Sequence, residues 1–326
     1  MFYTTLPHTN LRASSLCLGS TGFGSTNTEA ESARKLDQFL DAGGTLIDTA
    51  HCYSDWEPGE RHRSEKVIGR WLKSSGKRDK IVLCTKGGVS FIPGVSITES
   101  LDPNTLNAEL DDSLRNLGTD HIDLYWLHRD EPARPVAEIL EALNERVVKG
   151  DVRYIGCSNW KPERMAEAAD YARKKGIAAF VAHELEWSLA RRLVPETAID
   201  TTLPWMSDAM MDYHRKSGMT AFAFSSQAKG FFQKLDEKGA DGVSENLKRA
   251  FLTPASAAGW ERIRALRENT GMTVTQIMLG YIRGQKDFVG IPIVYGRTEA
   301  QMNDILAATD SVLTEDEIRF LLDGRY

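Results

Sequence analysis

The alternation of short β-like runs with amphipathic helical runs constrains this chain more than any other feature. Eight runs have β character, and a helical run follows each of them: 16–19, 45–50, 80–85, 122–128, 152–158, 179–184, 220–225 and 288–294. Strands that are separated by helices pair in parallel, and eight such units can close on themselves. The pattern therefore predicts an α/β fold, a (β/α)8 TIM barrel.

Several of the helical runs carry their own start and stop signals. Thr28 with Glu31 has the spacing of a capping box, and Asp102 before Pro103 is a cap followed by proline at the first helical position. Gly118 is placed to end the helix that Pro103 begins. We expect helices over 28–42, 64–73, 103–117, 135–149, 162–175, 204–216, 259–269 and 298–307.

Two segments stand outside this alternation. The opening residues contain two β-like runs around a turn at 7–10, which predicts a β-hairpin across one barrel mouth. The stretch 226–258 is rich in glycine and charge, and we expect it to be a functional loop. Because neither a repeat nor a linker divides the chain, residues 1–326 are predicted to form a single domain.

Composition excludes several classes of partner. Hydrophobic residues make up 41% of the chain and charged residues 26%, and the net charge is −6, so we expect no nucleic-acid binding. Since no apolar run approaches roughly 18 residues and the start lacks the features of a secretory signal, we expect no membrane contact. The four cysteines form no CxxC pair, which indicates buried reduced thiols and a cytoplasmic protein.

Four ionisable residues fall where catalytic groups of such barrels lie, at the carboxyl ends of strands. They are Asp48, Tyr53, Lys86 and His128. A lysine cation favours the phenolate form of a nearby tyrosine and so lowers its pKa. Asp48 can hold Lys86, and His128 can orient a carbonyl oxygen toward Tyr53. This combination predicts general acid/base catalysis by Tyr53.

The segments around these residues resemble the aldo-keto reductases, in order and over nearly the whole chain. The family signature places an Asp and a Tyr five residues apart, as Asp48 and Tyr53 are. The segments that carry the resemblance are GGTLIDTAHCYSDWEPGERHRSEKVIGRWL, LCTKGG, DDSLRNLGTDHIDLYWLH, RYIGCSNW, AFAFSSQAKGFF and IPIVYGRTEAQ. The resemblance implies that Tyr53 is the acid/base, that Asp48 and Lys86 tune it, and that His128 orients the substrate.

The resemblance also implies a nicotinamide cofactor, with NADP(H) favoured and NAD(H) as the alternative. Ser158 and Asn159 match a carboxamide-binding pair, and Phe224 matches the ring that stacks on the nicotinamide. Arg297, in a loop before a helix, is suited to an adenosine 2′-phosphate. The other matched positions are Gly19, Ser20, Thr21, Asp48, Ser225, Ser226, Gln227, Lys229, Tyr295, Gly296 and Gln301.

Two positions depart from the family pattern. Glu184 stands where the family usually has Gln, and Ile305 stands where it often has Asn. An ionised Glu184 beside the nicotinamide attracts the oxidised cofactor and biases the reaction toward alcohol oxidation. Protonation by burial, or pairing with Arg191 or Arg192, would remove that bias. The alternative is a salt-bridged structural carboxylate.

The substrate is expected to be a small carbonyl or alcohol compound. Asp55, Arg129 and Asp130 add polarity to the mouth and weakly favour a sugar or polyol, although solvated loop charge explains them as well. The expected pocket residues are Trp56, Arg129, Trp160 and Trp187. The seven histidines show neither HxH nor HExxH, so no metal site is predicted. The rival reading is a non-catalytic, NADP(H)-sensing regulatory subunit on the same fold.

Overall fold

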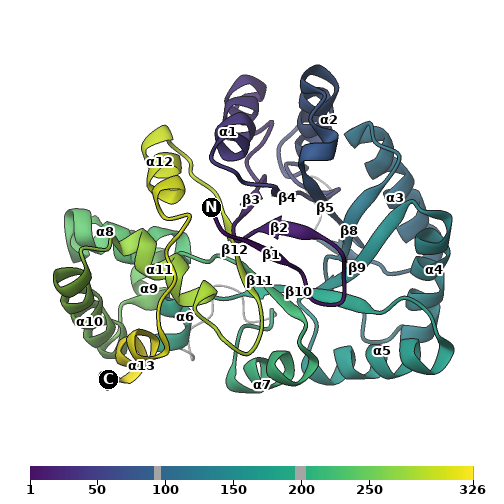
Figure 1. Ribbon diagram of the computed structural model, residues 1–326. Helices are drawn as coiled ribbons and strands as arrows, with labels where there is room; N and C mark the ends of the chain where they lie inside the picture. Colours follow the sequence, from purple (N-terminus) through teal and green to yellow (C-terminus); the bar gives the residue numbers. More distant parts are fainter. Residues whose placement is uncertain (92–96, 195–202, 326) are drawn as a thin grey trace. The chain divides into compact units, whose positions relative to one another are not determined.

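Eight strands form a closed parallel barrel, which confirms the predicted TIM-barrel fold (Figure 1). The computed structural model describes residues 1–91, 97–194 and 203–325. Around the barrel the strand order is β10-β11-β12-β3-β4-β5-β8-β9. The strands are β3 (Cys17–Gly19), β4 (Leu46–Asp48), β5 (Val82–Gly87), β8 (Ile122–Leu127), β9 (Val152–Ser158), β10 (Phe180–Glu186), β11 (Thr220–Phe224) and β12 (Gly290–Val294).

The predicted helices are present, but the one expected over 204–216 begins at Asp208 and the one expected over 259–269 begins at Pro254. Thr28 and Glu31 complete a capping box, Asp102 accepts from the amides of residues 104 and 105, and Gly118 ends its helix in the left-handed conformation. The helices are α1 (Glu29–Asp41), α2 (Arg63–Ser75), α3 (Pro103–Leu117), α4 (Val136–Lys149), α5 (Pro162–Lys175), α7 (Asp208–Ser217), α10 (Pro254–Thr270) and α12 (Glu299–Ala307).

The chain divides into two compact units, which are described separately. The first comprises Met1 and Tyr3–Glu184, and the second comprises Phe2 and Leu185–Tyr326. In the first unit, helices α1 to α5 lie outside the strands (Figure 1). That the whole chain acts as one domain stays a prediction.

The predicted N-terminal hairpin is formed by β1 (Tyr3–Thr5) and β2 (Arg12–Ser14), which pair antiparallel. Ser14 exchanges hydrogen bonds with Thr45, which directly precedes β4, and the backbone of Asn10 donates to the Tyr154 hydroxyl near the start of β9. The hairpin therefore lies at the amino ends of the strands, opposite the ends that carry the predicted catalytic residues. A second hairpin, β6 (Val89–Ser90) with β7 (Thr98–Glu99), was not predicted.

The prediction of a loop over 226–258 is wrong for most of its length. Helices α8 (Phe231–Lys238) and α9 (Glu245–Phe251) occupy it, with short 3-10 turns at Ala228–Gly230 and Ala240–Gly242. Its glycines mark helix ends rather than loop, and the buried Phe231 and Phe251 pack with ring centroids 5.5 Å apart. Three further helices were not predicted: α6 (Leu189–Leu193), α11 (Val274–Arg283) and α13 (Glu315–Asp323).

The four cysteines are free and buried, as their sequence surroundings indicated. Among the described residues, we find no helix with the length and apolar character needed to cross a membrane.

The packing of Gly156 gives a stability prediction for the first unit. Gly156 faces Trp126 on the neighbouring strand β8, and a Cβ atom at 156 would overlap the fully buried indole. We expect Gly156→Ala to lower the free energy of unfolding by about 1–3 kcal/mol through overpacking. The matched control is Gly118→Ala, where φ is +62° but no atom lies within 4 Å, so only conformational strain of about 1 kcal/mol applies. Urea denaturation measures both, and an equal loss would contradict the steric account.

Candidate active site

The strand ends of the first unit position the four predicted catalytic residues. Asp48 is the last residue of β4, Lys86 lies near the end of β5, and His128 directly follows β8. The ladder continues past β4, because the amide of His51 donates to the Lys86 carbonyl at 3.0 Å. This extension holds the loop that carries Tyr53 against the end of β5.

Lys86 is the centre of this group and is completely buried. Its ammonium donates to the Asp48 carboxylate, to the Thr49 carbonyl at 3.0 Å and to the Tyr53 hydroxyl at 3.1 Å. The Glu184 carboxylate lies 3.4 Å from the same nitrogen. These carboxylates keep the pKa of Lys86 well above its usual value although burial opposes this, so Lys86 is a cation.

The acidity of Tyr53 differs from the sequence-based expectation. Lys86 does lower the pKa of the phenol, but burial raises it more, and the charges of Asp48 and Glu184 add to the increase. The net shift of the Tyr53 pKa is therefore upward, and the residue is a protonated phenol at neutral pH. Desolvation and the Glu184 carboxyl, which the spacing of residues along the chain does not reveal, outweigh the effect of the lysine.

His128 is neutral and faces Tyr53. The two rings meet edge to face, with centroids 5.7 Å apart. Burial lowers the pKa of His128 well below its usual value, and the cations Lys86 and Arg129 lower it further. His128 Nδ1 lies 3.6 Å from the Cys52 thiol. A neutral imidazole in this position can donate one hydrogen bond to a carbonyl oxygen.

The predicted carboxamide pair lies beside this group. Asn159 has a φ of +61°, a conformation that asparagine tolerates, and its amide nitrogen Nδ2 donates to the His128 carbonyl at 3.1 Å and to the Ser158 hydroxyl at 3.0 Å. Its Oδ1 is buried and has no hydrogen-bond partner. Ser158 is aligned with Glu184 on the adjacent strand β10. Ser158, Asn159 and Glu184 thus lie together as the resemblance implied.

The first-strand loop is tied to the end of β4. Ser20 is buried and donates from its hydroxyl to the Asp48 carbonyl at 2.8 Å, while Gly19 is aligned with Asp48 in the ladder. Thr21 is exposed. The Ser54 hydroxyl donates to the Phe23 carbonyl at 3.0 Å, which connects this loop to the loop of Tyr53.

Only one of the three predicted pocket tryptophans is open to solvent. Trp56 is 39% exposed and packs near Tyr53 and against Phe91, with centroid distances of 6.4 and 5.5 Å. Trp160 and Trp187 are both 0% exposed and belong to the core of their respective units. Trp160 contacts Phe180 and Trp187 contacts aromatic residues of the second unit, so neither lines an open pocket here.

The polar residues that suggested a polyhydroxylated substrate are engaged in ion pairs. Arg129 pairs with Glu99 at 2.7 Å, and Asp130 pairs with Arg164 at 3.4 Å. Asp55 is buried and pairs with Arg61 at 3.1 Å. Their charges therefore hold loops together and favour a sugar or polyol less than their positions in the sequence suggested.

The second unit carries the other predicted cofactor residues. Phe224 ends β11, and the Ser226 hydroxyl donates to the Ile293 carbonyl at 2.7 Å. Ser225 and Lys229 have positive φ angles of 52° and 54° in the turn that follows. Gln227 accepts from the Gln233 side chain at 2.7 Å.

The loop after β12 leads into the start of α12, as predicted. Gly296 packs closely against the backbone of α12, and Tyr295 is half-buried. Gln301 completes a capping box with Thr298 and also accepts from the amide of Arg297, whose side chain is exposed.

Lys234 is a residue that sequence reasoning missed. Burial lowers its pKa, and the positive charges of Arg297 and Lys229 lower it further, so both cations lie close enough to act on Lys234. Lys234 also donates to the Lys229 carbonyl at 2.7 Å. It was overlooked because 226–258 was interpreted as loop. Such a cluster of cations favours a phosphate ligand.

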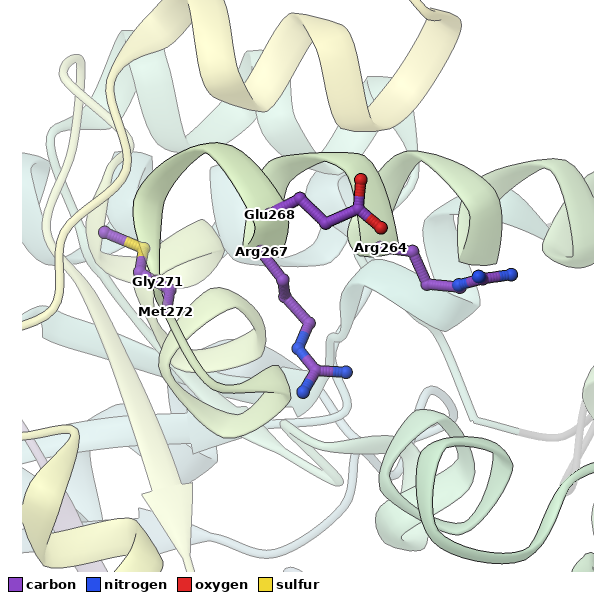
Figure 2. A pocket seen from close by; sticks show the side chains of 5 residues that line it. All are labelled: Arg264, Arg267, Glu268, Gly271 and Met272. Atoms are coloured by element: carbon purple, nitrogen blue, oxygen red, sulfur yellow. The ribbon is translucent and has the colours of Figure 1, made fainter.

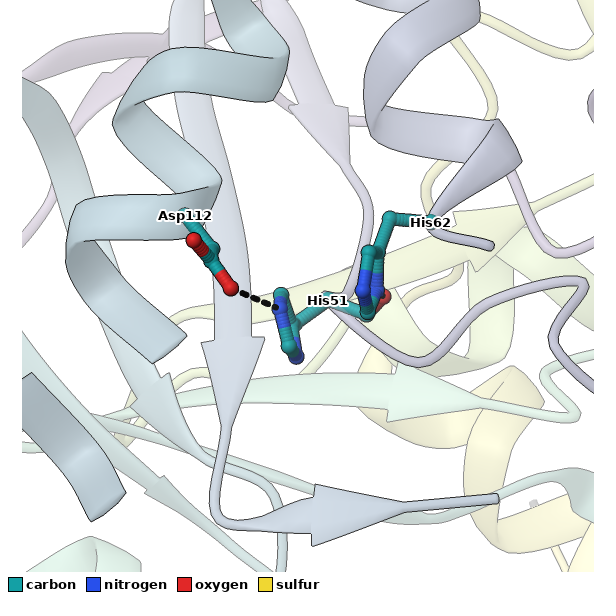
Figure 3. A group of neighbouring side chains, drawn as sticks. All are labelled: His51, His62 and Asp112. Atoms are coloured by element: carbon teal, nitrogen blue, oxygen red, sulfur yellow. Dashed lines mark hydrogen bonds and ion pairs between the residues drawn. The ribbon is translucent and has the colours of Figure 1, made fainter. Parts of the chain in front are cut away.

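Two histidines of the connection between β4 and α2 lie close to one aspartate of α3 (Figure 3). His51, His62 and Asp112 offer ligand atoms within 4.8 Å of one another, and neither nitrogen of the buried His51 ring has a hydrogen-bond partner. The two imidazoles are stacked, however, with centroids 3.9 Å apart and 20° between planes. Their lone pairs lie in nearly parallel planes and do not converge on one ion, so this arrangement does not favour a metal.

A surface hollow of about 330 Å³ lies in the second unit (Figure 2). It is lined by Arg264, Arg267, Glu268, Gly271 and Met272, and none of the predicted site residues belongs to it. Arg264 and Arg267 are paired with Glu261 and Asp236, so the hollow offers no free cluster of cations.

The buried pair of Lys86 and Asp48 gives a stability prediction. We expect Lys86→Met to lower the free energy of unfolding by about 3–5 kcal/mol, because it leaves the Asp48 carboxylate buried without its cation. The double variant Asp48→Asn/Lys86→Met removes both charges and should lose less than the single variant. Urea denaturation of the two variants makes the comparison. If the double variant is less stable than the single one, the uncompensated charge is not the cause.

Comparison with known proteins gives the family. The family model described as the aldo/keto reductase family matches residues 15–321. The chain is 30% identical to an uncharacterised oxidoreductase, YrpG, of Bacillus subtilis, over 99% of this chain and 95% of the relative. It is 26% identical to an aryl-alcohol dehydrogenase [NADP(+)] of Phanerodontia chrysosporium, over 93% of this chain and 77% of that one.

A third relative, norsolorinic acid reductase B of Dothistroma septosporum, is 28% identical over 98% of this chain and 80% of its own length. Members of this family use nicotinamide cofactors to interconvert carbonyls and alcohols. The protein therefore belongs to the aldo/keto reductase family and is an NAD(P)-dependent oxidoreductase.

Proposed function

We propose that this protein transfers a hydride between NADP(H) and a carbonyl or alcohol carbon, with Tyr53 as the group that gives or takes the proton. The observation that carries the proposal is the buried Lys86 ammonium, which bonds to the Asp48 carboxylate and to the Tyr53 hydroxyl at 3.1 Å. A tyrosine held in this way can donate its proton, because the phenolate that remains lies against a cation.

The raised pKa of Tyr53 favours carbonyl reduction at neutral pH. Reduction requires a phenol that can donate, and Tyr53 is in that form. An alkoxide is a stronger base than a phenolate, so the proton transfer remains favourable. The neutral His128, whose ring faces Tyr53, is proposed to orient the carbonyl oxygen by a hydrogen bond.

The residues of the first unit fit a nicotinamide. Oδ1 of Asn159 is buried without a hydrogen-bond partner, and a carboxamide NH2 would supply the missing donor. We propose that Ser158, Asn159 and Glu184 hold the carboxamide, beside Gly19, Ser20 and Thr21. The bound cofactor supplies the hydride, and the chain's own residues orient the substrate and move the proton.

We propose that the second unit holds the remainder of the cofactor. Phe224 offers a flat face for ring stacking, and Ser225, Ser226, Gln227 and Lys229 line a turn suited to the pyrophosphate. Tyr295, Gly296, Arg297 and Gln301 lie at the start of α12, where an anion is favoured. The positive charges of Arg297 and Lys229, which both act on Lys234, support NADP(H) over NAD(H).

The substrate is proposed to be a small carbonyl compound with an aromatic or apolar face. Trp56 and Phe91 pack next to Tyr53 and leave part of the indole exposed. Two of the relatives are named for an aryl alcohol and for norsolorinic acid. A sugar or polyol remains the second candidate, because indole faces also stack on sugar rings. Screening aryl aldehydes against aldoses and polyols, in both directions and with both cofactors, decides between them.

Replacement of Tyr53 tests the proposed acid/base. Tyr53→Phe keeps the ring but removes the proton, so turnover of a carbonyl substrate should fall by at least about 10²–10⁴-fold. Binding of NADPH, followed by fluorescence, should be unchanged. A variant with near-wild-type turnover would remove Tyr53 from the mechanism. If the wild-type protein binds NADPH but does not oxidise it over repeated turnovers with any carbonyl, the result would instead favour a non-catalytic, NADP(H)-sensing regulatory subunit.

Replacement of Arg297 tests the cofactor preference. Arg297→Ala should weaken NADPH binding by about 10- to 100-fold and NADH binding little, because only NADPH offers a 2′-phosphate to a charge-assisted contact. Arg264→Ala removes another arginine of the second unit, one paired with Glu261, and serves as the control. Equal losses for the two cofactors would contradict the assignment of Arg297.

A further inference from the structure

Glu184 is a fourth potential acceptor beside the Lys86 ammonium, which has only three N–H donors. An ammonium has three N–H donors, and those of Lys86 are taken by Asp48, the Thr49 carbonyl and the Tyr53 hydroxyl. Glu184 Oε2 lies 3.4 Å from the same nitrogen, is buried, and has no hydrogen-bond partner. A fourth acceptor at this distance can accept a hydrogen bond from the ammonium only if one of the other three acceptors loses its hydrogen bond.

We propose that Glu184 is a positioning residue that competes with Tyr53 for the Lys86 ammonium. Neutral Glu184 leaves the hydrogen bond from Lys86 to Tyr53 in place, and ionised Glu184 draws the ammonium away from it. Because the phenolate formed on proton donation depends on that cation, ionisation of Glu184 slows carbonyl reduction. The inference rests on the proposed role of Tyr53 and adds a pH-dependent control to it.

The surroundings of Glu184 raise its pKa, so that the carboxyl ionises within a pH range in which activity can be measured. Burial raises the pKa of this carboxyl to about 8, and the Asp48 carboxylate raises it while Lys86 lowers it. The pKa of Tyr53 is raised by burial, and that of Lys86 is held high by the carboxylates, so neither titrates near neutral pH. The other titratable groups of the first unit that Glu184 acts on, the thiols of Cys17 and Cys84, also stay protonated because burial raises their pKa values.

The arginines that were expected to neutralise Glu184 have other partners. Arg191 lies 3.7 Å from Glu186, and Arg192 lies 2.7 Å from Asp208. With its pKa near 8, Glu184 is mostly protonated at pH 7, so the expected bias toward the oxidised cofactor does not hold there. The carboxylate charge develops only as the pH rises through about 8.

The test is the pH profile of kcat/KM for carbonyl reduction in the wild type and in Glu184→Gln. Between pH 7 and pH 9 the wild type should lose about tenfold, the fall expected for a group that must be protonated and has a pKa near 8. Glu184→Gln cannot ionise and should lose less than about twofold over the same range. The comparison is the change of kcat/KM with pH within each protein, because Glu184 also belongs to the proposed carboxamide site and its replacement changes the absolute rate independently of pH.

Glu65→Gln is the matched control. Glu65 is also buried, and its pKa is raised to about 7. It accepts a hydrogen bond from the Thr85 hydroxyl, however, and the side chains of Thr85 and Lys86 point to opposite sides of β5 because the two residues are neighbours in one strand. This variant should keep the tenfold loss. If Glu184→Gln retains the wild-type profile, or if Glu65→Gln abolishes the loss, the proposal is overturned.

A second measurement does not depend on turnover. NMR of the glutamate side-chain carboxyl carbons should show a resonance that titrates near pH 8 in the wild type and is missing in Glu184→Gln. The absence of such a titration contradicts the proposal. If the wild type turns over no carbonyl at all, the proposed function fails, and this titration still decides whether Glu184 ionises beside Lys86.

Discussion

The charge of Lys86, buried at the end of β5, is the constraint on which the catalytic region depends. An ammonium without water must have its three protons bonded and its charge matched. Asp48, Thr49 and Tyr53 provide the bonds, and they come from the end of β4 and the loop that follows it. The same cation therefore holds the loop after β4 in place and stabilises the phenolate that Tyr53 would leave after donating its proton.

The same burial explains the direction of the pKa shifts. Removing a phenol or a carboxylic acid from water favours its neutral form, so Tyr53 and Glu184 both hold their protons more firmly. Lys86 remains charged chiefly because the Asp48 carboxylate faces it, and His128 remains neutral because burial and the nearby cations Lys86 and Arg129 both lower its pKa. The result is a site with a proton to donate and a neutral ring that can orient a carbonyl, which suits reduction at neutral pH.

The aromatic and the charged side chains of the loops near Tyr53 play different roles. Trp56 and Phe91 form an exposed aromatic contact next to Tyr53, whereas Asp55, Asp130 and Arg129 are paired with oppositely charged partners in loops. Charges that are paired in this way hold a loop in one conformation and have fewer contacts left to offer a ligand. Recognition of the substrate is for that reason proposed to depend on ring faces and on the Tyr53 and His128 groups.

The amino-acid sequence by itself determined the alternation of strands and helices, the positions of the caps, and the order of Asp48, Tyr53, Lys86 and His128 along strand ends. These features follow from local periodicity and from the rule that parallel strands end at one edge. Only the tertiary structure decided that Glu184 lies beside the Lys86 ammonium, that Arg297 acts on Lys234, and that Trp160 is buried. Each of these depends on side chains distant in sequence and on the desolvation that packing imposes, and none of the three can be read from spacing along the chain.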